Sequence, residues 1–143
     1  MKINPTVGID KLVFGMKKAD VEAIYGKSSK AYKDEEANDI VEFNPQKIRI
    51  TFYSDEDFKL GYLVSSSADL MIFDEKIIGE DTKKVIDFLM QKGLKSWEKS
   101  FADGVETYFN EDNWLLLHAE FGAITEIEVG AIFNHKDEFE WKF

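Results

Sequence analysis

The sequence predicts an α+β fold made of two tandem repeats, each a helix followed by three or four strands, with an antiparallel sheet that carries the helices on one face. Two observations support this class. A short amphipathic segment between glycines occurs at 15–26 and again at 79–93. Strand-like segments separated by turn residues follow each copy. The 143 residues fit a single domain, in which repeat one spans about 7–67, repeat two about 70–133, and 134–143 forms a C-terminal strand or lid.

Both glycine-flanked segments have the spacing of a helix that buries one face. Apolar residues lie at i, i+3 and i+4 in each segment, namely Val21, Ile24 and Tyr25 in the first and Val85, Phe88 and Leu89 in the second. Asp81 or Thr82 is the predicted N-cap of the second helix, and Gly26 and Gly93 are the predicted helix stops. Because the second segment is the longer of the two, its helix is expected to have about one additional turn.

Four strand-like segments follow each helix. They read SSKAYK, DIVEFN, QKIRITFY and FKLGYLVSS after Gly26, and LKSWEKS, GVETYFN, NWLLLHAEF and AITEIEVGAIF after Gly93. When the two helix stops, Gly26 and Gly93, are aligned, 48–53 aligns with 115–120. The same alignment matches Leu60 and Tyr62 with Ile127 and Val129.

Alternation along these strands predicts which face each residue occupies. The predicted helix-covered residues are Ile48, Ile50, Phe52, Phe58, Leu60, Tyr62, Leu115, Leu117, Ala119, Phe121, Ile127 and Val129. The opposite face is expected to carry Lys47, Arg49 and Thr51 together with the predicted partner-binding residues Tyr53, Glu106, Tyr108, Trp114, Leu116, His118, Glu120, Glu126 and Glu128. An uncovered sheet face that mixes aromatic residues with carboxylates is a candidate binding surface. The C-terminal segment, with Phe139, Trp141 and Phe143 in alternation, could instead cover this face or add an edge strand.

The charge balance limits the classes of partner that the chain is expected to bind. The chain has 18 Lys and Arg against 28 Asp and Glu, a net charge of −10. This charge disfavours nucleic acid and anionic membranes, and it favours a basic protein partner by electrostatic steering. No cysteine is present, which excludes disulfides, thiol nucleophiles and thiolate zinc sites. The segment MKINPTVGID has no apolar run of signal-peptide length, and no run approaches a membrane span, so a cytoplasmic location is expected.

The sequence contains no recognisable catalytic or cofactor motif. Neither GxxxxGK[ST] nor GxGxxG is present, and no serine stands in GxSxG. The two histidines, His118 and His135, are far apart in the sequence and form no HxxxH pattern. We therefore predict no catalytic residues, no cofactor and no metal site, and a protein that is not an enzyme.

The first glycine-flanked segment also carries a resemblance to a known family. Phe14, Gly15, Met16, Val21, Glu22 and Gly26 resemble the opening of the helix-plus-strands repeat of β-lactamase inhibitor protein and of outer-membrane-assembly lipoprotein modules. The second copy keeps Ile78, Gly79, Val85 and Gly93 but has Glu80 in place of the methionine. This resemblance implies a tandem pair over nearly the whole chain and a binding role through the sheet face. In size, charge and lack of catalytic residues, the chain is also similar to bacterial toxin-immunity proteins.

These observations predict a cytoplasmic immunity protein that neutralises a basic, nuclease-type toxin, with the acidic residues Asp34, Glu35 and Glu36 adding to the contact. An alternative is a small-ligand-binding or assembly-factor module with a cavity lined by Phe52, Tyr62, Phe88 and Leu117. The chain is expected to be a monomer or a weak homodimer. A homodimer would form by edge-to-edge pairing of 139–143.

Overall fold

The computed structural model describes all 143 residues and has two helices, α1 (Lys18–Tyr25) and α2 (Thr82–Gln91), with a 3-10 turn at Ser54–Glu56. The strands are β1 (Lys2–Asn4), β2 (Gly8–Ile9), β3 (Leu12–Val13), β4 (Lys30–Lys33), β5 (Asp39–Phe43), β6 (Ile48–Tyr53), β7 (Lys59–Ser65), β8 (Met71–Ile72), β9 (Glu75–Lys76), β10 (Glu98–Ala102), β11 (Val105–Asn110), β12 (Leu115–Glu120) and β13 (Ala123–Gly130).

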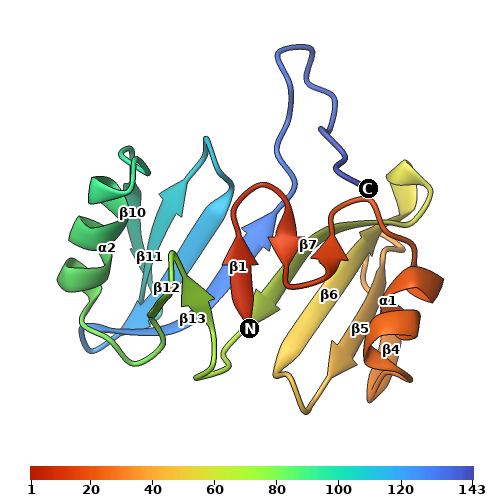
Figure 1. Ribbon diagram of the computed structural model, residues 1–143, viewed down its shortest axis with the longest axis horizontal. Coiled ribbons are helices and arrows are strands. Elements are labelled where there is room, and N and C mark those ends of the chain that lie inside the picture. The colour runs from red at the N-terminus through yellow and green to blue at the C-terminus, as the bar shows by residue number, and fades with distance from the viewer.

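Eight strands form one large sheet in the order β10-β11-β12-β13-β7-β6-β5-β4. All of its neighbouring strands are antiparallel. Helix α1 lies near the β4 end of this sheet and α2 near the β10 end (Figure 1). Residues from both helices pack in the same core cluster as the inward side chains of the strands. The predicted α+β class and the antiparallel sheet are confirmed.

A second sheet of five short strands lies between the two helices (Figure 1). Its strand order is β3-β2-β1-β8-β9. Strands β1 and β8 pair in parallel, and the other neighbouring strands of this sheet are antiparallel. Buried residues such as Ile3, Ile9 and Ile72 join it to the common core. This sheet was not predicted from the sequence, because such short strands cannot show alternation.

The predicted N-cap of α2 and both predicted helix stops are confirmed, but α2, with 10 residues, exceeds the 8 residues of α1 by less than the expected full turn. Asp81 is the N-cap of α2, and its carboxylate accepts a hydrogen bond from the Lys84 backbone N–H at 3.0 Å. Gly26 follows α1 with φ 82°, and Gly93 follows α2 with φ 96°. Since both values lie in the left-handed region that glycine adopts at low cost, these residues end the helices.

Most of the predicted core residues are buried, and three are not. Ile48, Ile50, Phe52, Leu60, Leu115, Leu117, Ala119, Ile127 and Val129 are each at most 3% exposed. Phe58 and Phe121 instead stand in turns, with φ 56° and 51°, and are exposed. Tyr62 was predicted to point inward but pairs with Thr51 on the other face, because a bulge at Gly61 interrupts the alternation of β7.

The same backbone irregularities occur at matching places in the two halves of the large sheet. Lys47 and Trp114, which are equivalent when Gly26 is aligned with Gly93, both have left-handed backbone, with φ 51° and 48°. Their N–H groups donate to the carbonyls of Asn44 and Glu111, at 3.1 and 3.2 Å. Each residue is the last of a turn, before β6 in one half and before β12 in the other.

The bulges match as well. The register shifts between Thr51 and Phe52 in one half and between His118 and Ala119 in the other, again at equivalent positions. Each partner strand leaves one residue unpaired at this shift, Gly61 in β7 and Thr125 in β13.

Matching Gly61 with Thr125 changes the alignment of the last strand in each half. Leu60 and Leu63 correspond to Ile124 and Ile127. The predicted alignment of Leu60 with Ile127 and of Tyr62 with Val129 was therefore wrong. The cause is the connection before β7, at 54–58, which is longer than the connection before β13, at 121–122.

Residues 131–143, here called the C-terminal strap, do not add a strand to the large sheet. The strap projects from the end of β13 and returns to the turn before α1 (Figure 1). There the backbone N–H groups of Lys142 and Phe143 donate to the Phe14 carbonyl at 3.1 and 3.2 Å. The edges of the large sheet are β4 and β10, so edge-to-edge pairing through 139–143 lacks the edge strand it requires.

Candidate functional site

The candidate site is the face of the large sheet opposite the helices, called here the open face. The strand register aligns one row of side chains across all eight strands of this face. From β4 to β10 the row consists of Lys30, Glu42, Arg49, Val64, Glu128, Leu116, Phe109 and Glu98. At its centre Val64 is 5% exposed, and the neighbouring Glu128 and Leu116 are half-buried. The centre of the open face is thus partly apolar and partly shielded from solvent.

Most of the predicted partner-binding residues lie on or next to β6, β12 and β13, on this face of the sheet. His118 pairs with Glu126 and Leu116 pairs with Glu128, and Trp114 immediately precedes β12. Tyr53 stands at the end of β6, and Glu120 is exposed at the end of β12. The structure therefore brings these residues to one surface.

Glu106 and Tyr108 do not belong to that surface. They pair with Ala119 and Leu117, which are both fully buried on the helix side. The Tyr108 hydroxyl donates to the Glu106 carboxylate at 2.6 Å. Their predicted position was wrong because the turn after Asn110 places Asn110 opposite Leu115, so even-numbered residues of β11 face the same way as odd-numbered residues of β12. Phe109, which the prediction omitted, takes a place on the open face.

An aromatic band borders the open face on the side of the strap. Trp114 lies over Gly130, where an added Cβ would come within 2.1 Å of the indole ring. Tyr53 lies over Gly61 in the same manner, at 2.0 Å. The ring centroids of Trp114 and Phe109 are 5.0 Å apart, and those of Tyr53 and Phe139 are 5.4 Å apart. Because the two glycines leave room for the rings, these half-buried aromatics are held in place by packing within the chain itself.

Burial shifts the pKa of several side chains on this face, among them Glu128 and Tyr53. Burial raises the pKa of Glu128, and it is opposed by nearby Arg49 and reinforced by Glu126. Burial also raises the pKa of Tyr53, with further contributions from Tyr62, Glu128 and Glu36. The Tyr53 hydroxyl therefore remains protonated at neutral pH, and it is available as a hydrogen-bond donor next to carboxylates.

Replacing Glu128 by glutamine is expected to raise the melting temperature at pH 7. The raised pKa means that the folded chain holds a proton more tightly than the unfolded chain, so the ionised carboxylate costs stability above its folded pKa. The gain from Glu128→Gln should disappear as the pH falls below about 4.5, where the carboxyl is protonated in both states. Thermal melts between pH 3 and 8 measure it, and a gain that persists at pH 3 would contradict it. Glu120→Gln, at an exposed strand end, should change the melting temperature less.

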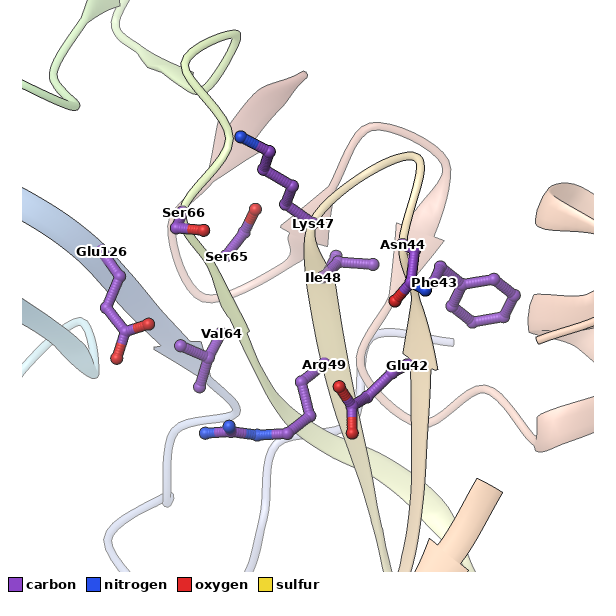
Figure 2. Close-up of a pocket in the computed structure, with 10 residues that line it drawn as sticks. All are labelled: Glu42, Phe43, Asn44, Lys47, Ile48, Arg49, Val64, Ser65, Ser66 and Glu126. Carbon is purple, nitrogen blue, oxygen red and sulfur yellow. The ribbon is translucent and has the colours of Figure 1, made fainter. Parts of the chain in front are cut away.

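A hollow of about 210 Å³ lies on the open face beside the centre of the sheet. Figure 2 shows the Arg49 side chain reaching past Val64 toward β13, with Glu42 and Glu126 on either side. The hollow is lined by Glu42, Phe43, Asn44, Lys47, Ile48, Arg49, Val64, Ser65, Ser66 and Glu126. Alternation places Arg49 on this face but the predicted binding residues do not include it, although it is the single arginine of the chain.

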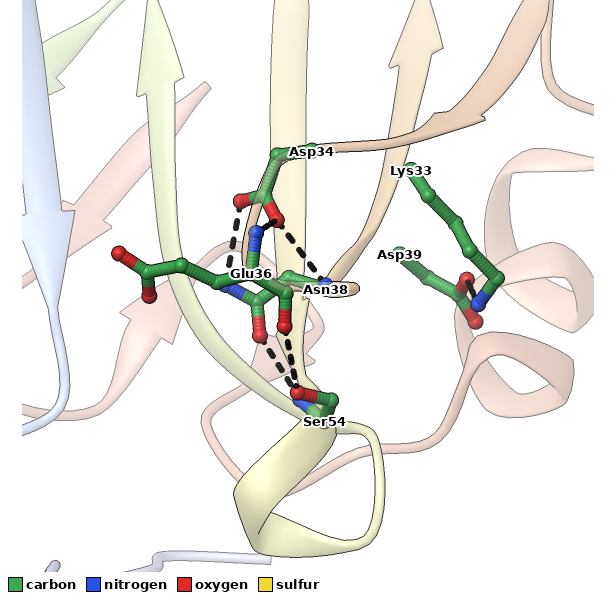
Figure 3. A network of polar contacts seen from close by, with 6 residues as sticks. All are labelled: Lys33, Asp34, Glu36, Asn38, Asp39 and Ser54. Carbon is green, nitrogen blue, oxygen red and sulfur yellow. Dashed lines mark hydrogen bonds and ion pairs between the residues drawn. The ribbon is translucent and has the colours of Figure 1, made fainter.

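The acidic turn between β4 and β5 is an ordered structure at the rim of the sheet (Figure 3). The Asp34 carboxylate accepts hydrogen bonds from the backbone N–H groups of Glu36 and Asn38, at 2.9 and 3.0 Å, and from the Asn38 side chain at 3.1 Å. Asn38 in turn accepts from the Ser54 N–H at 2.8 Å. The network ties this turn to the segment that follows β6. The network holds Glu36 near Tyr53, and the Glu36 carboxylate helps to raise the pKa of Tyr53.

Replacing Asp34 by alanine is expected to lower the melting temperature at neutral pH, and less so in acid. Desolvation alone would raise the pKa of Asp34, but hydrogen bonds from Asn38 and Glu36 outweigh it and hold the pKa below the usual 3.8. The stabilisation is therefore complete above about pH 3.8 and is lost as the pH falls through the lower folded pKa. Melts of Asp34→Ala and of the control Glu35→Ala at pH 7 and pH 2 measure this. A loss of melting temperature in Asp34→Ala that is equally large at pH 7 and pH 2 would contradict this expectation.

The four residues predicted to line a ligand cavity do not share one. Phe52 and Leu117 are fully buried in the core on the helix side, whereas Tyr62 lies on the open face. Phe88 instead borders a surface hollow between α2 and the β8-β9 hairpin. No group of three or more His, Asp or Glu side chains is placed to hold a metal ion. Neither helix is long and apolar enough to cross a membrane.

Comparison with known proteins gives a likeness in fold only. No protein-family model matches the chain, and no curated protein matches it. A solved structure that resembles it is an extracellular protein containing a SCP domain from Bacillus anthracis strain Ames, with a TM-score of 0.55 and 12% sequence identity. The match covers 80% of this chain and 42% of that one, so this chain spans less than half of its structural neighbour.

Proposed function

We propose that this chain is a non-enzymatic, cytoplasmic binding protein, namely an immunity protein that neutralises a basic, nuclease-type toxin through the open face. The observation that carries the proposal is the centre of that face. Glu128 is a half-buried carboxylate between Val64 and Leu116, in a position where it costs the free protein stability. A group that is kept at such a cost is better explained by a partner than by the fold.

The surroundings of Glu128 support a protein partner. Tyr53 and Trp114 are pre-positioned aromatic residues of the kind that dominate binding energy at interfaces. Further carboxylates surround the same surface, namely those of Glu36, Glu42, Glu120 and Glu126. The net charge of −10 adds long-range attraction for a basic protein. The proposed contact thus has a half-buried carboxylate between apolar residues at its centre, an aromatic band along one border, and further carboxylates around it.

The experiment that tests this function begins with the protein encoded beside this chain in its source genome, or with affinity capture from the source organism. The expected partner is basic, binds directly to the purified chain, and stops growth when it is expressed alone in a test bacterium. Co-expression of this chain should restore growth. A captured protein that has no effect on growth, or whose effect persists when this chain is bound, would overturn the assignment.

We also propose that the two halves of the chain are copies of one unit. Each consists of a short hairpin, a helix and four antiparallel strands, from β2 to β7 and from β8 to β13. The matching turns, left-handed residues and bulges support this proposal, since such features are retained within families as parts of a design. Homologous sequences in which the turns at 44–47 and 111–114 vary in length independently would contradict it.

A further inference from the structure

The single arginine of the chain lies on the open face of the large sheet. Arg49 is exposed, and it forms no ion pair, although the chain has 28 acidic residues. Every ion pair of the molecule uses lysine. The guanidinium fork is the donor set that best matches a planar oxyanion, so an unpaired arginine near the centre of a binding face is a candidate recognition group for such an acceptor.

The walls around Arg49 indicate which acceptor fits. Lys47 and Ser66 stand on the same hollow as Arg49, and Val64 contributes an apolar surface. Glu42 and Glu126 flank the hollow, as Figure 2 shows. These two carboxylates would repel a phosphate dianion more than a carboxylate, which carries one charge. They would also attract basic groups on either side of it.

The size of the hollow agrees with a side chain as the occupant. Pockets that hold drug-sized ligands measure roughly 300–1,000 Å³, whereas this hollow measures about 210 Å³. We propose that the hollow binds an aspartate or glutamate side chain of the protein partner, with its carboxylate on Arg49 and with basic residues of the same segment on Glu42 and Glu126. This inference rests on the proposed function and specifies the partner's contact: an acidic residue surrounded by basic ones.

The test uses two capped tripeptides as probes, Lys-Asp-Lys and Lys-Asn-Lys, which differ only in the central charge. Because the chain has one arginine, a ¹⁵N spectrum contains one arginine Nε–H signal, which reports on Arg49 directly. We expect Lys-Asp-Lys to shift this signal saturably and to bind about fivefold more tightly than Lys-Asn-Lys, as for an ion pair near solvent.

In Arg49→Gln, followed at the backbone amide of Ser66, the two peptides should bind equally. The matched control is Lys30→Gln, which removes a charge from the same row of the open face at its edge. Lys30→Gln should retain the preference for the acidic peptide. Equal binding of both peptides to the native chain, or loss of the preference in Lys30→Gln as well, would overturn the inference.

The partner itself separates this inference from the proposed function. Arg49→Gln is expected to weaken partner binding about tenfold, as loss of a charge-assisted contact does. If Arg49→Gln binds the partner normally while charge reversal at Glu126 and Glu128 abolishes binding, the inference fails and the proposed function stands. If neither change affects binding, the open face is not the interface, and both fail.

Discussion

Charge reversal of Glu126 and Glu128 to lysine should weaken binding of the proposed basic partner by about 100-fold or more. The two carboxylates are neighbours on one face of β13, at the centre of the open face, and no ion pair within the chain occupies either of them. Reversal removes attraction for basic groups of the partner and places like charges opposite them. Glu128 is half-buried, so the substitution places the reversed charge in the least hydrated part of the contact.

The matched control is the double variant Glu22→Lys and Asp87→Lys, which changes the net charge equally. These two exposed residues lie on α1 and α2, on the side of the molecule away from the open face. The control should slow association modestly and leave dissociation unchanged. Kinetics measured at several salt concentrations distinguish the two variants, because long-range steering is screened by salt and direct contacts are screened less. Equal losses in both double variants would mean that net charge, rather than this face, determines binding.

Gly130→Ala should destabilise the fold by about 1–3 kcal/mol, through overpacking against Trp114. The added Cβ would meet the indole Cδ1 at 2.1 Å, and the indole is confined by Phe109 and Phe133, at 5.0 and 6.2 Å between ring centroids. The ring must therefore move outward. The same substitution is also expected to weaken partner binding, since it displaces an aromatic residue that is held in position on the open face.

A double-mutant cycle tests the cause of this loss. In a Trp114→Ala background the space above Gly130 is empty, so Gly130→Ala should then cost little, and the two substitutions should be strongly non-additive. Denaturant unfolding of the four proteins in the cycle measures the interaction. Additive losses would show that the cost arises from the backbone at Gly130 rather than from the indole ring.

The large sheet could be predicted from sequence because its strands are long enough to show alternation and each is bounded by turn residues. The eight strands predicted to follow the two helices, both helices and the Asp81 cap are present. The errors in facing have two local causes. The bulge at Gly61 reverses the facing of Tyr62, and the turn after Asn110 reverses the facing of Glu106 and Tyr108. Alternation is reliable within a strand but carries no information across a bulge or a turn.

Other features of the candidate site could not be read from local patterns. Burial beside Val64 and Leu116, reinforced by Glu126, raises the pKa of Glu128. That neighbourhood depends on pairing between β7 and β13, strands that are far apart in the sequence. Arg49 could have been singled out from the sequence, since it is a lone arginine among many lysines. Its significance depends on the absence of an ion pair, which only the arrangement of neighbouring side chains reveals.

The pairing of β7 with β13, at the centre of the large sheet, has a two-fold symmetric register. Leu63 faces Val129, Ser65 faces Ile127, and Val64 faces Glu128, so equivalent positions of β7 and β13 exchange places across an axis near Val64 and Glu128.

The side chains do not follow this axis, since Arg49 on one side corresponds to Leu116 on the other, and Lys47 corresponds to Trp114. A strand register that is symmetric at the centre of the sheet thus presents a surface with a distinct polarity. A partner that matched it in one orientation would mismatch it after a half-turn, so the expected complex contains one partner per chain, held in one direction.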